Sequence, residues 1–283
     1  VDRSAKDFNS QNIANSLLAL NQMGVRWVDL PRGLDEKLWE AVSRNVQDFN
    51  AQEIANSLLA LDQMGVRWGD LPKSLSEDLW AAVDRSAQDF NAQGIANSLL
   101  ALNQMGVRWD NLPKGLSDNL WAAVDRSAQD FNAQNIANSL LAIDQMGVRW
   151  SDLPRGLDEK LWAAVSKNAK DFNAQNIANS LLALNQMGVR WGDLPRGLDE
   201  KLWAAVYRNA QDFNAQEIAN SLLALNQMGV RWGDLPRGLD EKLWAAVDRN
   251  AQDFNAQDIA NSLLALNQMG VRWGDLPRGL DEK

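Results

Sequence analysis

The polar residues of this chain that could bind a ligand recur once every 41 residues, beginning with Asn12, Asn15, Gln22 and Arg26. The carboxamides of Asn and Gln both donate and accept hydrogen bonds, as nucleic-acid bases and peptide backbones require. The guanidinium of Arg suits phosphate oxygens. This spacing predicts a repetitive binding surface rather than a reaction centre.

Position 12 of the repeat varies most within the first predicted helix. One interpretation is that this residue selects the ligand, as in helical repeats that read one base each. The other is a tolerant site in the first helical turn, where Asn, Glu and Asp all serve the cap; Gly is poor there, which counts against capping alone. The seven residues are Asn12, Glu53, Gly94, Asn135, Asn176, Glu217 and Asp258.

Position 15 is always Asn and position 22 is always Gln. The Asn row could contact a ligand, or it could form a structural ladder with Asn or Ser of neighbouring repeats, because buried polar groups need partners. Ser16 and its copies are expected to be structural, whereas the small Ala19 and its copies would leave room for a ligand. The Asn row is Asn15, Asn56, Asn97, Asn138, Asn179, Asn220 and Asn261. The Gln row is Gln22, Gln63, Gln104, Gln145, Gln186, Gln227 and Gln268.

Position 26 is always Arg, and position 3 is Arg or Lys. These cations would form a phosphate track along one edge, or they would pair with the copies of Asp7 and Asp29. The acidic balance of the chain favours pairing for at least one of the two rows. The row at position 26 is Arg26, Arg67, Arg108, Arg149, Arg190, Arg231 and Arg272.

Thirteen Trp residues occupy positions 27 and 39. Trp39 and its copies follow the apolar spacing of the second helix, so we expect them in the core. Trp27 and its copies are expected to close the contact between repeats, with stacking on bases as the alternative.

Neither Cys nor His occurs, which excludes disulfides, thiolate chemistry, imidazole bases and the usual zinc sites. No nucleophile triad, paired-carboxylate site or phosphate-binding loop departs from the repeat, so we expect no enzymatic activity, cofactor or metal. The net charge of −9 counts against unspecific attraction to nucleic acid or anionic lipid. No run approaches the ~18 apolar residues of a membrane span, and the first residues do not resemble a signal peptide, so we expect no membrane partner.

One repeat domain is expected over residues 1–283, because the repeats account for nearly all the rare residues, such as Phe at position 8 and Pro at position 31. A period between 20 and 50 residues is typical of a solenoid or propeller. The repeats span 1–41, 42–82, 83–123, 124–164, 165–205, 206–246 and 247–283, the last being truncated.

The first helix of each repeat has clear signals, as residues 172–188 illustrate. Asn173 is a good N-cap, Ile177 and Leu181 begin an apolar stripe, and Gly188 supplies a left-handed end. After a loop with a short 3₁₀ turn, a second helix is expected to begin near position 35, always Asp or Ser, and to cross into the next repeat. Strands are not expected, because β-branched residues are few and do not alternate. The predicted fold is all-α: a right-handed superhelical solenoid of seven tandem 41-residue helix pairs.

The stretch FNAQNIANSLLALNQMGVRW at 172–191 resembles the octotricopeptide repeat and its relatives among the large repeat effectors of plant-pathogenic bacteria. The similarity lies in Phe172-Asn173, Gln175, the run 177–181 and Gly188, and it recurs in all seven repeats. It implies a helix-pair superhelix and, from the organellar members of that family, binding of RNA. The family repeat is usually shorter, and its common aromatic residue is replaced here by Leu182.

The leading hypothesis is therefore a non-enzymatic solenoid that binds single-stranded RNA through positions 12, 15 and 22, with the Arg row at position 26 on phosphate. The alternative is a protein or peptide scaffold such as a bacterial effector, which the acidic balance favours; a third is an engineered near-consensus array. The stripe of Ile259, Leu263 and Leu266 lacks the partner residues that would follow Lys283. We expect this stripe to be exposed and to promote end-to-end association.

Overall fold

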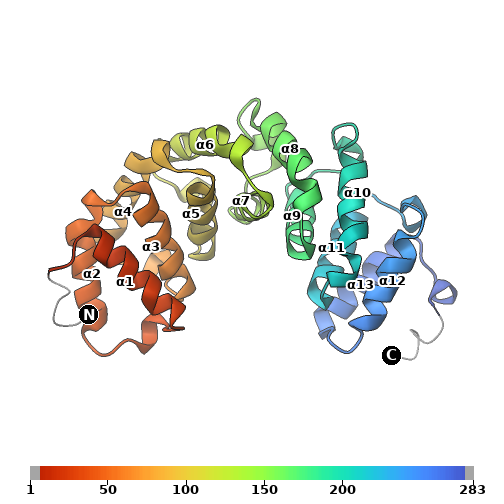
Figure 1. The fold of residues 1–283 in the computed structure, drawn as a ribbon, viewed down its shortest axis with the longest axis horizontal. Coiled ribbons are helices and arrows are strands. Elements are labelled where there is room, and N and C mark those ends of the chain that lie inside the picture. The colour runs from red at the N-terminus through yellow and green to blue at the C-terminus, as the bar shows by residue number, and fades with distance from the viewer. Residues whose placement is uncertain (1–6, 278–283) are drawn as a thin grey trace. The chain divides into compact units, whose positions relative to one another are not determined.

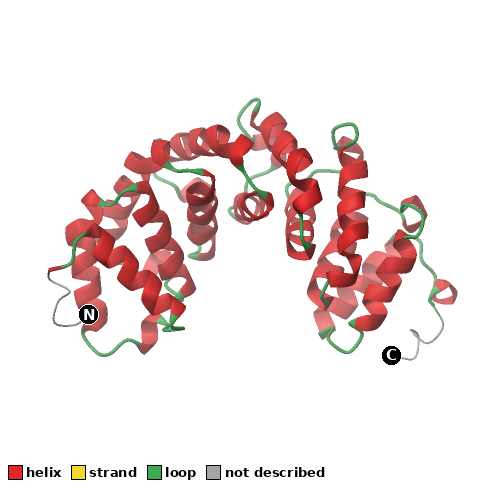
Figure 2. Cartoon of the chain, viewed as in Figure 1, coloured by secondary structure: helices red, strands yellow, loops and turns green. Residues whose placement is uncertain are grey.

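The computed structural model describes residues 7–277, which contain thirteen α-helices and no strand (Figures 1 and 2). Two helices alternate in each repeat, here called the A helix and the B helix. The A helices are α1 (Ser10–Gln22), α3 (Ala51–Gln63), α5 (Ala92–Gln104), α7 (Ala133–Gln145), α9 (Ala174–Gln186), α11 (Ala215–Gln227) and α13 (Ala256–Gln268). The B helices are α2 (Leu34–Asn45), α4 (Lys73–Ser86), α6 (Leu116–Ser127), α8 (Leu157–Asn168), α10 (Leu198–Asn209) and α12 (Leu239–Arg249).

The chain divides into two compact parts, Val1–Phe131 with Gln145–Gly147 and Asn132–Asp144 with Val148–Lys283. In the first part α3 packs against α1 and α5, and in the second α11 packs against α9 and α13. A helices thus pack directly on A helices, as the stacking of a solenoid requires. The predicted all-α solenoid of tandem helix pairs is confirmed in each part.

Helix α9 begins and ends where its sequence predicts. The Asn173 side chain accepts a hydrogen bond from the Asn176 backbone N–H at 2.8 Å, which caps the helix start. After α9 ends at Gln186, Gly188 adopts a left-handed φ of 89° and turns the chain toward the next element. The loop contains the predicted 3₁₀ turn, at Trp191–Asp193.

The B helices start after a second left-handed glycine, such as Gly197 with φ 79° before α10. Ser74 occupies this position in the second repeat, and α4 begins there at Lys73, earlier than its counterparts. A residue with a Cβ disfavours the left-handed conformation, so the chain continues as helix instead. Each helix start therefore follows from one residue of the loop.

The core is a repeat of the same apolar positions. In the second repeat Val42, Ile54, Leu58 and Leu79 have no exposed surface. No helix in the described range is long and apolar enough to cross a bilayer.

Three expectations about exposure were wrong. The copies of Ala19 do not line a ligand path: Ala60 and Ala224 are fully buried, because this position packs toward the preceding A helix. Trp39 and its copies are half-buried rather than in the core. Ile259 and Leu263 are 45% and 50% exposed as expected, but Leu266 is only 5% exposed.

Candidate ligand-binding surface

An exposed, uncharged stripe runs along each A helix. In α9 it consists of Gln175, Asn179, Leu182 and Gln186, which follow the i, i+4, i+7, i+11 spacing of one helix face. The two Gln are exposed, and Asn179 and Leu182 are half-buried. The sequence predicts ligand contacts at positions 15 and 22 of this face, but not at Leu182, whose side chain shows its half-burial only in the folded chain.

The Asn row at position 15 lies at the centre of this stripe. Among the described residues, no copy of Asn15 has a hydrogen-bond partner, so the alternative of an Asn and Ser ladder between repeats is not formed. The copies of Ser16 are buried, and their hydroxyls in six repeats, such as Ser180 Oγ, have no partner either. The Asn carboxamides therefore keep both a donor and an acceptor available at a half-buried surface.

Four of the Gln side chains at position 22 already form a hydrogen bond within the protein. In four repeats the Gln Oε1 accepts a hydrogen bond from the position-21 Asn of the preceding repeat. The pairs are Asn21 with Gln63, Asn103 with Gln145, Asn185 with Gln227, and Asn226 with Gln268, at 2.5–2.6 Å. This row consequently links neighbouring A helices, in addition to lying on the exposed stripe.

Asp replaces Asn at position 21 in two repeats, at Asp62 and Asp144. Partial burial raises the pKa of both carboxyl groups to about 6, and the nearby Arg67 opposes this shift at Asp62. Position 21 is therefore neutral in the five repeats with Asn, and it carries a partly buried carboxyl group in the two repeats with Asp.

Position 12 serves the start of the A helix in most repeats. Asn12, Glu53, Asn135, Asn176 and Glu217 each accept a hydrogen bond from the backbone N–H of the N-cap Asn, which completes a reciprocal capping box. Their exposure also varies, since Asn135 and Asn176 are only 5% and 7% exposed. The capping interpretation explains these contacts. The third repeat, with Gly94, and the seventh, with the buried Asp258, lack this reciprocal bond.

The Arg row at position 26 is exposed throughout. Arg26 forms an ion pair with Asp29 at 2.7 Å, and Arg67 donates to the Gln104 carbonyl. The side chains of the other five have no partner among the described residues. They are Arg108, Arg149, Arg190, Arg231 and Arg272.

The cations at position 3 are structural instead. Arg208 donates to the Ala169 carbonyl and Arg249 to the Phe213 carbonyl, each in the preceding repeat. In these two repeats the guanidinium therefore contacts the backbone of the preceding repeat.

The two Trp residues of each of the first six repeats form a pair. The rings of Trp191 and Trp203 lie 4.2 Å apart, and the Trp191 backbone N–H donates to the Met228 carbonyl of the next repeat. The contact between repeats expected at position 27 is thus made by its backbone, while its ring packs on position 39.

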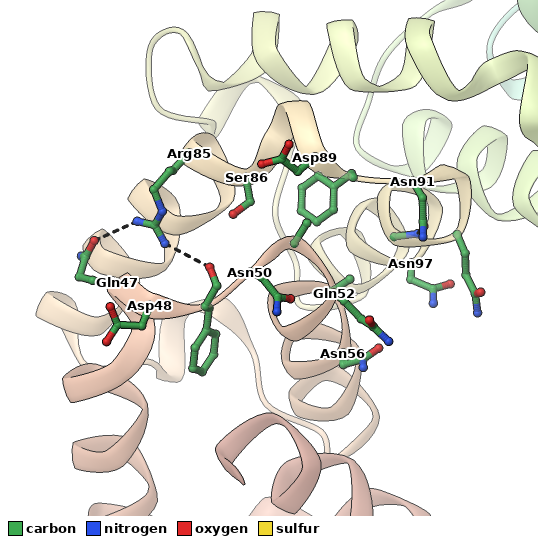
Figure 3. Close-up of a pocket in the computed structure, with 16 residues that line it drawn as sticks. Gln47, Asp48, Asn50, Gln52, Asn56, Arg85, Ser86, Asp89, Asn91 and Asn97 are labelled. Atoms are coloured by element: carbon green, nitrogen blue, oxygen red, sulfur yellow. Dashed lines mark hydrogen bonds between the residues drawn. The ribbon is translucent and has the colours of Figure 1, made fainter. Parts of the chain in front are cut away.

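A hollow of about 770 Å³ opens between the N-terminal ends of α3 and α5 (Figure 3). Its walls include Gln52 and Asn56 of α3 together with Gln93, Gly94 and Asn97 of α5. It therefore contains residues of positions 11, 12 and 15. The sequence signal for this hollow was available in part, because Gly94 is the one residue at position 12 without a side chain.

No cluster of three or more ionisable side chains suited to a metal ion occurs in residues 7–277. The surface thus consists of carboxamides and one Leu per repeat, with the Arg row at position 26 along its edge. Such groups can bind an extended ligand by hydrogen bonds and apolar contact.

Comparison with protein families yields one match, and no curated protein matches the chain significantly. The matching family is described as a protein of unknown function, DUF1601. It matches seven times, at residues 1–17, 23–58, 64–99, 105–140, 146–181, 187–222 and 228–263. Each complete match runs from the end of one A helix, through the B helix, into the next A helix. The chain belongs to the DUF1601 family, as a tandem array of its helical repeat.

Proposed function

We propose that this chain is a non-enzymatic binding protein whose A helices hold an extended polypeptide. The observation that carries the proposal is the row of Asn side chains at position 15, half-buried in all repeats but the first and none with a partner among the described residues. One carboxamide can accept from a peptide N–H and donate to a peptide carbonyl at the same time. A row with one such group per repeat suits a ligand whose backbone repeats as well.

Leu182 and its copies support a polypeptide ligand, because they add a half-buried apolar contact beside each Asn. Apolar contacts would engage ligand side chains, while the carboxamides would engage its backbone. Together the two residue types provide affinity without requiring charge on the ligand.

The charges favour polypeptide over RNA. Binding of nucleic acid depends on Lys and Arg that neutralise phosphates. The stripe of Gln175, Asn179, Leu182 and Gln186 has no cation, and acidic residues lie near the starts of α3 and α11, at Glu53 and Glu217. The net charge of −9 acts in the same direction.

Single-stranded RNA is the second candidate, and the Arg row at position 26 favours it. Five guanidiniums without a partner lie next to the C-terminal ends of A helices, where they could meet phosphates. The resemblance to octotricopeptide repeats suggests the same ligand, whereas the resemblance to bacterial repeat effectors suggests a protein partner.

The test uses the full chain against a displayed library of random dodecapeptides and a random single-stranded RNA pool, at low and physiological salt. Ala replaces Asn56, Asn97, Asn179 and Asn220 together in one variant. A matched control carries Ala at four exposed B-helix residues, Glu36, Glu77, Glu200 and Glu241.

We expect enriched peptides to bind the chain, and the Asn variant to lose affinity by at least about tenfold while the control retains it. Peptide binding that is insensitive to the Asn residues would contradict the proposed surface. If RNA binds instead, and replacing the position-26 row with Gln abolishes its salt dependence, the RNA candidate replaces the polypeptide.

A further inference from the structure

Position 21, in the last turn of each A helix, is a site where two repeats depart from the pattern of the others. In four repeats this residue is an Asn whose Nδ2 donates to the Gln Oε1 of the next A helix, as Asn103 does to Gln145 at 2.6 Å. The two neighbouring pairs of A helices without this bond are those in which position 21 is Asp, at Asp62 and Asp144. The replacement removes the donor from the link and leaves an acceptor in its place.

The Asp residues leave two acceptors without a donor in each of these places. Asp62 and Gln104 correspond to the bonded pair of the other repeats. Neither side chain has a hydrogen-bond partner among the described residues, so the Asp62 carboxylate and Gln104 Oε1 both lack a donor. The same holds for Asp144 and Gln186. A ligand group that carries several N–H donors would complete either pair.

A hollow of about 560 Å³ gives a ligand access to Asp62. Its walls come from the C-terminal ends of three A helices, with Asp62 and Gln63 of α3, Asn103 and Gln104 of α5, and Gln145 of α7. These side chains belong to positions 21 and 22, so the hollow adjoins the exposed stripe that is proposed to hold the polypeptide. A side chain of the ligand could therefore enter the hollow while the ligand backbone follows the stripe.

The electrostatics at these two Asp residues favour a cation. The C-terminal end of a helix carries a partial negative charge, and the last turns of α3 and α7 contain no basic residue that would offset it. Asp62 and Asp144 place a carboxylate in the same turns. Partial burial disfavours their charged form, which is why the pKa of both carboxyl groups is raised to about 6. A bound cation would offset the helix dipole and the cost of burial together.

Arg67 is the one cation that lines the hollow, and it leaves the Asp62 carboxylate open. Its guanidinium donates to the Gln104 carbonyl at the end of α5, and no ion pair joins it to Asp62 in the part of the chain that the structure describes. Its charge opposes the raised pKa of Asp62 only as the smaller of two effects. The contact with Gln104 also demonstrates that the C-terminal end of an A helix accepts N–H donors from a positively charged group.

We propose that the hollow at Asp62, and the equivalent pair of Asp144 and Gln186, each bind a basic side chain, Lys or Arg, of the polypeptide ligand. Its N–H groups would donate to the Asp carboxylate and to the Gln Oε1 of the next repeat, the acceptor that Asn satisfies elsewhere in the array. A ligand carboxylate would be repelled, and an apolar side chain would leave both acceptors unsatisfied. The inference rests on the proposed function, and it makes position 21 the one that selects residues of the ligand.

The test compares peptides selected from the random dodecapeptide library by the unchanged chain with those selected by Asp62→Asn, by Asp144→Asn and by the double variant. Each substitution introduces the Asn that the other five repeats have at this position, so the fold is expected to persist, which circular dichroism checks. The matched control, Asp130→Asn with Asp171→Asn, removes two charges from exposed residues instead.

We expect the unchanged chain and the control to enrich peptides with Lys or Arg at fixed positions, each single variant to lose one of these preferences, and the double variant to lose both. Replacing such a residue by Gln in an enriched peptide should weaken binding by about tenfold at low salt, and by less at high salt. Asn226→Asp should add a preference for a basic residue, because it removes the donor to Gln268. Enrichment of acidic or apolar residues, or of no particular residue while peptides still bind, would overturn the inference and leave the proposed function standing.

A further variant distinguishes a bound cation from a rotated Gln side chain. Gln104→Leu removes the second acceptor, so it should weaken peptides that depend on Asp62 by about threefold. The same change at Gln227 is the control and should leave the preference for the basic residue intact. If Gln104 Nε2 turned toward Asp62 and satisfied it, Gln104→Leu would free the carboxylate. Unchanged or stronger binding to this variant would therefore overturn the inference.

A probe independent of the library separates this site from the proposed function if no peptide is enriched. N-acetyl-lysine amide at millimolar concentration should shift the NMR signals of the Gln104 side-chain NH₂ in the unchanged chain, and not in Asp62→Asn. The uncharged N-acetyl-norleucine amide should give no shift. A missing shift with the lysine probe would overturn the site for a basic residue, whatever the outcome for polypeptide binding.

Discussion

The Asn185 carboxamide donates to Gln227 Oε1 across one repeat, at a distance of 2.5 Å. The same bond recurs between three other pairs of A helices, always from position 21 to position 22 of the next repeat. Because these groups lie at the surface, the bond fixes how neighbouring A helices align more than it stabilises the core.

Replacing Asn185 and Gln227 by Ala, singly and together, tests this link. We expect a coupling energy of about 0.5 kcal/mol from the double-mutant cycle, small because the bond is exposed. Urea unfolding of the four proteins provides the measurement. The pair Asn179 and Gln227 is the control and should show no coupling; an equal coupling there would mean that the effect is not due to the bond.

Asp144 predicts a pH dependence of stability. Its pKa is raised to about 6 in the folded chain, above the value of 3.8 for an ordinary Asp, because partial burial disfavours the charge. The folded state therefore holds this proton more tightly than the unfolded state. Stability from this proton is present below about pH 4 and is lost as the pH rises through 6.

Asp144→Asn should accordingly stabilise the chain at about pH 7.5, by no more than about 1 kcal/mol because solvent screens a half-exposed group. The gain should shrink at about pH 4, where the Asp is protonated. Thermal unfolding at both pH values checks this, with the exposed Asp171→Asn as control. A gain that is the same at both pH values would contradict the assigned cause.

The two left-handed glycines of a repeat should differ in tolerance. Gly188→Ala should cost about 1–2 kcal/mol, because a Cβ disfavours the φ of 89° that ends the A helix. Gly197→Ser should cost less than about 1 kcal/mol, because the loop can start its helix earlier, as the second repeat does with Ser74. Chemical denaturation compares the two, and equal costs would refute the explanation given for α4.

Ser180→Ala should stabilise the chain by about 1 kcal/mol. Its hydroxyl is buried without a partner, at 1% exposure, and removing an unsatisfied polar group recovers its desolvation cost. Asn179→Ala, at a half-buried surface, should change stability by less than about 0.5 kcal/mol. Destabilisation by Ser180→Ala would show that the hydroxyl has a hydrogen-bond partner in solution.

The start, the end and the buried face of each A helix could be predicted from the sequence. Asn173 caps α9, Gly188 ends the turn that follows it, and the apolar period around Ile177 gives a helix with one buried face. Each of these signals acts within a few residues of the chain, so neighbouring sequence suffices to predict it. The 41-residue period then predicts the tandem array, because each copy must bury its apolar face on another.

Contacts between repeats were decided only by the tertiary structure. Ala60 lies opposite the apolar stripe on a helical wheel, but it is fully buried, because α3 packs against α1 and α5 as well as against α4, the B helix of its own repeat. The half-burial of Leu182 and the missing partners of Asn179 follow from the same packing. A helical wheel predicts one buried face and one exposed face for each helix. In a stacked array the neighbouring A helices cover part of the second face, so that only a narrow stripe of each A helix stays exposed.

The hollow at the third repeat depends both on the local sequence and on the tertiary packing. Gly94 and Ser86 are visible in the sequence as short residues at positions 12 and 4, but they are eight residues apart on different helices. Folding brings them to the same hollow and leaves the Asn91 N–H and the Ser86 hydroxyl without partners. The sequence determined which side chains are short, and the tertiary structure decided that both line one hollow, because only the packing of α3 against α5 encloses that space.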